Sequence, residues 1–148
     1  MARKPRVQVH ASFRVHIALQ IQLSGPARRD IAAILRRSLD EFGEDASLRY
    51  EALIQQALCD IGADPERPGS KERAEIMIKG ARTWRLELSR TRVSGPGVKA
   101  PRHFILYRRR EDGVVHRRRE DGVIEVARIL DHGRDLQRHL PEDYRRHN

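Results

Sequence analysis

Apolar and polar residues alternate from Val15 to Leu23, with valine, isoleucine or leucine at every second position. A period of two places one side of the segment against a core and the other in water, so 15–23 is predicted to be a half-buried strand. Ser24, Gly25 and Pro26 then end the strand and begin a helix. Ser24 is the expected N-cap, and Pro26 fits the first helical turn.

Two amphipathic helices are predicted next, over 26–42 and 45–61. A glycine follows or ends each apolar pattern, Gly43 for the first and Gly62 for the second, where a left-handed residue commonly terminates a helix. So short a link makes the pair an antiparallel helical hairpin. The loop 63–73 contains two prolines and a glycine. Both apolar stripes must be covered, and a sheet built from the rest of the chain is the only candidate.

Two strands are predicted from the middle of the chain. The segment 83–89 alternates, with Trp84, Leu86 and Leu88 facing inward. The run 104–107 is apolar throughout, which is typical of a central strand buried on both faces.

The last predicted strand is 123–130, and a helical turn over 135–140 is expected after it. The pattern predicts an α+β fold with an N-terminal strand, an antiparallel helical hairpin and then a three-strand antiparallel sheet. We expect one domain over 15–141, preceded by a basic flexible arm at 1–14 and followed by a tail at 142–148.

A tandem nine-residue repeat, RRREDGVVH at 108–116 and RRREDGVIE at 117–125, separates the last two strands. Each copy contains Asp-Gly, a strong hairpin-turn signal. The long apolar faces of the final strand specify its register, so we expect the second copy's Val-Ile-Glu-Val to continue into that strand. The first copy is then extruded as an exposed excursion, either a tolerated insertion or a contact for an acidic partner.

Composition adds a strong positive charge to this picture. The 148 residues hold 30 Lys+Arg and 21 Asp+Glu, a formal net charge of +9, which permits nucleic acid, a ribonucleoprotein or an acidic protein as partner. Only 5% of residues are aromatic, which weakens the case for a protein that stacks single-stranded bases. No apolar run approaches the ~20 residues of a membrane span, so a cytoplasmic protein is expected. The lone Cys59 is expected to be a half-buried structural thiol.

Candidate chemistry is sparse: no zinc motif, glycine-rich phosphate loop or nucleophile elbow is present, so no metal or cofactor is expected. Metal-free RNA cleavage needs only a base for the 2′-hydroxyl, an acid for the leaving oxygen and cations for the phosphate. Tyr107, Arg82, Arg85, Arg128 and His132 would supply these roles if the sheet gathered them. The plainer interpretation makes Tyr107 a packing residue and gives Arg82 and Arg128 ion pairs or binding contacts.

Four short segments, taken in order, carry a family pattern. They are Leu23-Ser24 with Ala27 and Asp30-Ile31, Gly80-Ala81-Arg82-Thr83-Trp84 continuing to Ser89-Arg90, Pro101-Arg102-His103-Phe104 continuing to Tyr107-Arg108, and Arg128-Ile129-Leu130-Asp131-His132-Gly133-Arg134-Asp135 continuing to His139-Leu140. In this order and spacing, from about Ile17 to Pro141, the chain resembles the ParE branch of the RelE/ParE toxins of bacterial type II toxin–antitoxin systems.

The resemblance implies a helical hairpin packed on an antiparallel sheet, and a toxin that inhibits DNA gyrase until a small ParD-like antitoxin binds it in a hetero-oligomer. No sequence-specific nucleic-acid binding is implied. The implied antitoxin-binding residues are Arg82, Trp84, Leu86 and Arg128. The implied target-binding residues are His132, Arg134, Arg138 and His139.

Two other hypotheses stay open beside the gyrase inhibitor. RelE members are ribosome-dependent mRNA endonucleases, and a RelE-like activity here would use Tyr107, Arg128 and His132. The chain also departs from the pattern: Asp131 interrupts the expected Leu-His pair, and the duplication at 108–125 is extra. The third hypothesis is therefore an inactive toxin-like protein that only binds its antitoxin.

Overall fold

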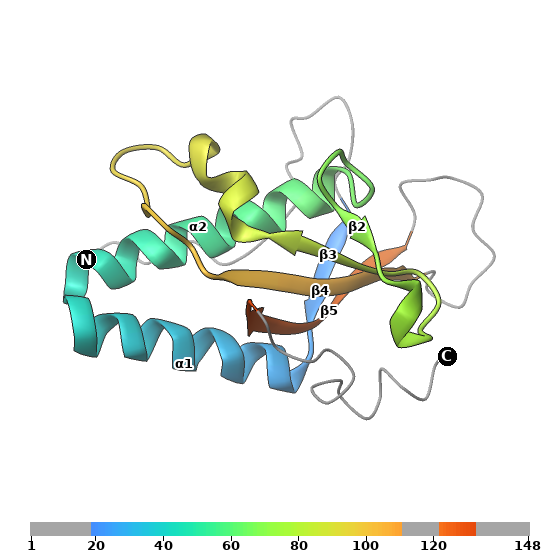
Figure 1. The fold of residues 1–148 in the computed structure, drawn as a ribbon, viewed down its shortest axis with the longest axis horizontal. Helices are drawn as coiled ribbons and strands as arrows, with labels where there is room; N and C mark the ends of the chain where they lie inside the picture. Colours follow the sequence, from blue (N-terminus) through green and yellow to red (C-terminus); the bar gives the residue numbers. More distant parts are fainter. Residues whose placement is uncertain (1–18, 111–121, 133–148) are drawn as a thin grey trace.

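The computed structural model describes residues 19–110 and 122–132, whose strands form one five-stranded sheet (Figure 1). The order is β1-β5-β4-β3-β2, with bounds Gln20–Leu23 (β1), Lys71–Glu72 (β2), Ala81–Arg85 (β3), His103–Arg110 (β4) and Val123–Asp131 (β5). β1 runs parallel to β5, and the other neighbours are antiparallel. The α+β class is confirmed. The expected three-strand antiparallel sheet is wrong, because β1 joins beside β5 and β2 adds a short edge strand.

β1 and the first helix, α1 (Gly25–Phe42), form where the pattern places them. Ile21 and Leu23 are half-buried between exposed glutamines, as a half-buried strand requires. Ser24 caps α1: its Oγ accepts the Ala27 N–H at 2.9 Å and donates to the Ala127 carbonyl at 2.7 Å. One hydroxyl thus begins the helix and ties it to β5. The expected arm at 1–14 lies outside the described residues.

The second helix, α2, runs from Glu44 to Ala63 and completes the predicted helical hairpin (Figure 1). Gly43, with a φ of 95°, separates the two helices as expected. The expected stop at Gly62 is wrong, since α2 continues through it. Glycine inside a helix costs about 1 kcal/mol relative to alanine. Here it is buried, and its carbonyl accepts the Leu19 N–H at 2.9 Å where the chain enters β1.

The segment 83–89 differs from its prediction. β3 ends at Arg85, and Leu86–Arg92 form a 3₁₀ helix, η2. Trp84 and Leu86 are buried as predicted, but Leu88 is exposed and Ser89 is buried instead. A 3₁₀ helix has three residues per turn, so Leu86 and Ser89 share a face. The inward–outward alternation therefore stops at Leu86.

β4 and β5 form the predicted antiparallel hairpin, with Arg110 opposite Val123 as the last pair. The second copy's Val-Ile-Glu-Val lies in β5, which confirms its predicted place in the core strand. The first copy is not extruded from its start, because residues 108–110 belong to β4. The Arg108 guanidinium donates to Glu125 at 2.8 Å, and Arg110 also pairs with that carboxylate. Residues 111–121 and the helical turn expected at 135–140 lie outside the described residues.

The helices cover one face of the sheet, where the main core forms. Its largest buried side chains come from α2, β3, β4, β5 and η2: Leu53, Ile54, Leu58, Ile61, Trp84, Leu86, Ile105, Tyr107, Ile124 and Val126. On the other face a smaller cluster forms under the 3₁₀ helix η1 (Ala74–Ile76), and contains Ile76, Ile78, Ala81, Leu106 and Ala127. β4 is thus buried on both faces, as predicted for 104–107.

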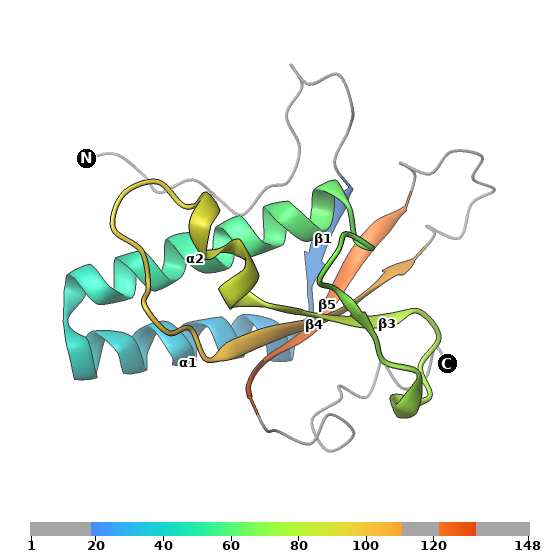
Figure 2. The ribbon, with the colours of Figure 1, turned by 45° about the horizontal axis from the view of Figure 1, so that its top comes forward.

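The helical hairpin is longer than the sheet beneath it. Figures 1 and 2 both show the connection between α1 and α2 reaching well past the end at which β4 begins and β5 finishes. We call this projecting part the hairpin overhang, and define it as residues 37–50.

Candidate functional site

Five polar or titratable residues meet where the sheet ends beneath the helical hairpin. We call Tyr50, Arg102, His103, Asp131 and His132 the sheet-end cluster. His103 and Asp131 are the last paired positions of β4 and β5, and the His132 N–H donates to the Arg102 carbonyl at 2.9 Å. The strand pairing therefore holds these four residues together, and Tyr50 reaches them from α2.

Tyr50 and His103 share a short hydrogen bond. Tyr50 Oη lies 2.6 Å from His103 Nδ1, and the two rings meet edge to face with centroids 5.5 Å apart. Tyr50 Oη also accepts the Arg102 N–H at 3.2 Å. Either group can donate in the bond between Oη and Nδ1, because the roles depend on which imidazole nitrogen carries the hydrogen.

Burial shifts both groups of this pair toward their neutral forms. Burial lowers the pKa of His103, and Arg102, Arg37 and His132 act in the same direction against the opposing charge of Asp131. Burial also raises the pKa of Tyr50. A neutral imidazole hydrogen-bonded to a neutral phenol is consistent with both shifts.

The other residues of the cluster leave polar groups available. Asp131 Oδ1 is buried and has no hydrogen-bond partner in the described chain, and the Arg102 Nε is 4.0 Å away. His132 is exposed, and its ring stacks on Phe104 with centroids 6.2 Å apart. Two imidazoles, a phenol, a carboxylate and a guanidinium are groups that can transfer protons and bind an anion without a metal.

The structure brings together only part of the expected endonuclease set: Arg82 is the partner of Tyr107 across β3 and β4, whereas Arg128 lies opposite Leu106 and His132 follows the end of β5. The Tyr107 hydroxyl donates to the Pro65 carbonyl at 2.5 Å, and burial raises the pKa of Tyr107. Tyr107 also lies four positions along β4 from His103, or about 13 Å at ~3.3 Å per residue. Of Tyr107, Arg128 and His132, only His132 belongs to the sheet-end cluster.

Arg128 is held by α1. Its Nε and Nη2 donate to the two Asp30 oxygens at 2.7 and 2.8 Å, and the Ile129 N–H donates to the same carboxylate at 2.9 Å. The hydrogen bonds to Asp30 raise the pKa of Arg128. The Asp30 carboxylate thereby accepts a backbone N–H of β5 beyond the end of β1, so this contact is structural.

The residues expected to bind an antitoxin are mostly internal. Trp84 and Leu86 are in the core, and the Arg82 Nε and Nη2 donate to Ser70 Oγ at 3.0 and 2.7 Å. Their role in binding stays a prediction. Arg134, Arg138 and His139 lie outside the described residues, and His132 is exposed; target binding by these residues stays a prediction.

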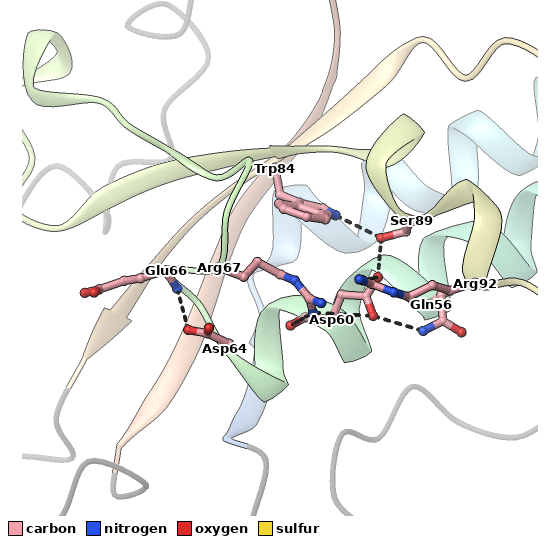
Figure 3. Close-up of polar contacts among 8 residues, drawn as sticks. All are labelled: Gln56, Asp60, Asp64, Glu66, Arg67, Trp84, Ser89 and Arg92. Atoms are coloured by element: carbon pink, nitrogen blue, oxygen red, sulfur yellow. Dashed lines mark hydrogen bonds and ion pairs between the residues drawn. The ribbon is translucent and has the colours of Figure 1, made fainter.

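A second polar network, drawn in Figure 3, joins α2 to η2. The buried Asp60 carboxylate accepts from Ser89 at 2.5 Å and Gln56 at 3.0 Å, and lies 3.1 Å from Arg92 and 3.6 Å from Arg67. Ser89 in turn accepts the Trp84 indole N–H at 2.9 Å. These atoms bond one another, so the network fastens η2 to α2.

Sequence patterns alone did not find these two polar groups, although weak signals exist. Asp60 falls on the apolar stripe of α2, seven residues after Leu53, and an acid on such a stripe indicates a buried polar contact. Tyr50 lies on the same stripe. Its contact with His103 joins residues 53 apart, and no local pattern reports such a contact.

Other site classes receive no support from the described residues. Within 19–110 and 122–132, no group of three metal-ligating side chains is close enough to hold an ion. No helix in this part of the chain is long and apolar enough to cross a membrane. Cys59 is half-buried on α2, in agreement with its expected environment.

A scan against protein-family models finds no match to this chain, and a search of curated proteins finds none either.

Proposed function

We propose that this chain is the toxin of a type II toxin–antitoxin module, of the ParE type, which inhibits DNA gyrase by binding it and is neutralised by a ParD-like antitoxin. We prefer binding over catalysis because two of the candidate catalytic groups form hydrogen bonds with other residues of the chain. The Tyr107 hydroxyl is committed to the Pro65 carbonyl and the Arg128 guanidinium to Asp30. Both groups therefore already serve contacts within the fold.

The order of the elements supports the proposal, whereas the sheet is mixed, because β1 runs parallel to β5. A strand, a helical hairpin and a run of antiparallel strands follow one another in that order, and both helices pack on one face of the sheet. The segment that carries the family's last motif begins in β5 and leaves the sheet at Asp131 and His132. The net charge of +9 suits an acidic antitoxin, since opposite charge speeds encounter and selects the partner.

The sheet-end cluster favours one second candidate, a RelE-type endonuclease at a different place from the residues first expected. His132 would transfer a proton and Arg102 would bind the scissile phosphate, while Tyr50 and His103 position the strand ends. This reaction needs no metal.

Purified protein tested in parallel for inhibition of gyrase supercoiling and for mRNA cleavage on translating ribosomes separates the candidates. The first proposal expects loss of supercoiling and intact mRNA. Cleavage with normal supercoiling would contradict it. In that case loss of cleavage in His132→Ala, but not in the control Tyr107→Phe, would locate the activity at the sheet-end cluster.

Antitoxin binding is tested separately, by co-purification of the chain with the product of any small acidic reading frame beside its gene. Inactivity in both target assays together with retained co-purification would indicate a toxin-like protein that only binds its antitoxin. Inactivity without co-purification would reject the toxin–antitoxin assignment.

A further inference from the structure

The connection between η2 and β4, residues 93–102, belongs to a strongly basic stretch of the chain. From Leu88 to Arg110 the sequence contains arginine and lysine but no aspartate or glutamate. Figures 1 and 2 both show this connection, drawn in yellow, standing out beside α2. Arg90 on η2 and Lys99 on the connection are exposed. This surface therefore carries positive charge that no acid of its own segment balances.

The charges of Arg90 and Lys99 are not compensated within the described residues. Arg90 Nη1 donates to the Lys99 carbonyl at 2.5 Å, which holds the guanidinium beside the connection without neutralising it. Neither side chain forms an ion pair inside 19–110 and 122–132, whereas Arg92 shares the Asp60 carboxylate with Arg67. A guanidinium has several N–H donors, so Arg90 keeps donors for an anion while one of them fixes its position.

The exposed tip of the connection, Ser94-Gly95-Pro96-Gly97, adds backbone donors. The N–H groups of Ser94, Gly95 and Gly97 have no hydrogen-bond acceptor in the part of the chain that the structure describes. A Cβ at Gly95 would meet no atom within 4 Å, and one at Gly97 would meet only the Arg90 Cγ, at 4.0 Å, so a ligand can approach this backbone. Pro96 has no N–H and interrupts the row of donors. The tip therefore suits a phosphate group at its surface better than an enclosed nucleotide.

The larger apolar side chains of the connection face inward, since Val93 and Val98 pack on the main core. A protein partner is held chiefly by buried aromatic and apolar anchors at the centre of the interface. Contacts to a nucleic-acid backbone come instead from cations, hydroxyl groups and backbone N–H groups. The connection offers these groups outward, so its chemistry favours a nucleic-acid backbone over an acidic protein.

We propose that the segment 90–99 binds the phosphodiester backbone of a nucleic acid without reading its base sequence. Arg90 and Lys99 contact phosphates, and the N–H groups of the tip donate to phosphate oxygens. Each neutralised phosphate releases counterions, so the binding weakens as salt concentration rises. The inference goes beyond the proposed function, because this contact needs neither gyrase nor an antitoxin and is measured without them.

The test is fluorescence anisotropy of the full chain with a short labelled DNA duplex over a range of salt concentrations. In the double variant Arg90→Gln, Lys99→Gln the slope of log affinity against log salt should become shallower by about 2, and binding at low salt should weaken by roughly tenfold. The matched control is Arg28→Gln, Arg29→Gln, which changes the net charge equally. Both control residues are exposed on α1 without an ion pair among the described residues, and this variant should keep the wild-type slope.

A second variant, Gly97→Asp, guards against a misfolded loop. It places an acid at the tip without removing the bond from Arg90 to Lys99, and it should also weaken binding, whereas Ala33→Asp on the exposed side of α1 should not. Thermal unfolding followed by Trp84 fluorescence shows whether each variant keeps its fold.

Two further probes identify the ligand. A single-stranded RNA of the same length distinguishes the two sources of a phosphodiester backbone, and a loss of binding in the loop variants with either nucleic acid supports the proposal. A wild type that binds neither nucleic acid at low salt, loop variants with the wild-type slope, or an equal loss in the α1 controls would overturn it. A loss confined to a labelled poly-glutamate peptide would also overturn it and would assign the surface to an acidic protein.

Discussion

Asp60 is the buried charge on which the contact between α2 and η2 depends, and Asp60→Ala should be severely destabilising. The substitution removes the acceptor of the Ser89 hydroxyl and the Gln56 amide, together with the counter-ion of Arg67 and Arg92. Ser89 is fully buried, so its hydroxyl cannot turn to water instead.

The size of the stability loss depends on which partners of Asp60 can be hydrated after the substitution. Breaking a fully buried ion pair costs about 3–5 kcal/mol. Here the Arg92 side chain is 46% exposed and Arg67 is 19% exposed, so both recover part of their hydration. The hydrogen bond from Ser89 to a buried carboxylate contributes about 1.5–3 kcal/mol. We expect the free energy of unfolding to fall by about 3 kcal/mol, and Tm by about 6–12 °C for a domain of this size.

Intrinsic fluorescence can follow this change, because Trp84 is the single tryptophan and its indole N–H donates to Ser89 at 2.9 Å. Urea unfolding followed by Trp84 fluorescence measures the loss. Asp64→Ala is the matched control, since Asp64 is exposed and accepts one backbone N–H, from Glu66 at 3.1 Å. It should cost less than about 1 kcal/mol. If the two variants differ by less than about 0.5 kcal/mol, the stabilising role argued for Asp60 is wrong.

Four further outcomes are expected, each measured by urea or thermal unfolding. Met77→Gly should stabilise by about 0.5–1 kcal/mol, since Met77 has a φ of 60° and a side chain that is 70% exposed; a loss would contradict this. Gly69→Ala should cost about 2 kcal/mol, because Gly69 has a φ of 105° and a Cβ there would lie 3.2 Å from the Trp84 ring; a neutral effect would refute it. Burial lowers the pKa of His103 below the ordinary 6.5, so the unfolded chain binds the proton more tightly and stability should fall as pH drops below about 7. In His103→Gln this part of the fall in stability at low pH should be absent. An unchanged slope of stability against pH would contradict the prediction. Deleting 114–122, which leaves one copy of the repeat, should keep the fold, and an unfolded variant would show that the duplication is structural.

Local signals predicted the elements well where a single residue decides the backbone. Ser24 and Gly43 mark the start and end of α1 because a cap hydroxyl and a residue with positive φ act within one turn. The 3₁₀ helix after Arg85 was missed because Leu86 and Leu88 fit a period of two as well as Leu86 and Ser89 fit a period of three. Only the buried bond from Ser89 to Asp60, 29 residues away, decides between them.

The candidate site was predictable in composition but not in position. Tyr107 pairs with Val126, which lies six residues before His132, and the β4–β5 pairing is irregular between Leu106 and Tyr107. Which tyrosine meets a histidine is decided by the packing of α2 on β4, which brings Tyr50 to His103. The sequence placed His103 at the start of a strand and His132 in the tail, whereas the contact of His103 with Tyr50 needed the tertiary structure.

The β4–β5 pair also separates the duplication from the sheet-end cluster. The pair of Arg110 with Val123 closes the hairpin at one end, and the pair of His103 with Asp131 closes it at the other. The two rungs are seven residues apart along β4, or about 23 Å. At the closing end, Glu125 pairs with Arg108 and Arg110, so the outermost residues of the repeat themselves help to fix the register. A single copy would still supply Glu-Asp-Gly between Arg110 and Val123, a loop length that antiparallel strands accept. Changes in repeat length therefore act at the opposite end of the hairpin from the cluster, and any effect of the duplication on function must come from what its own arginines contact.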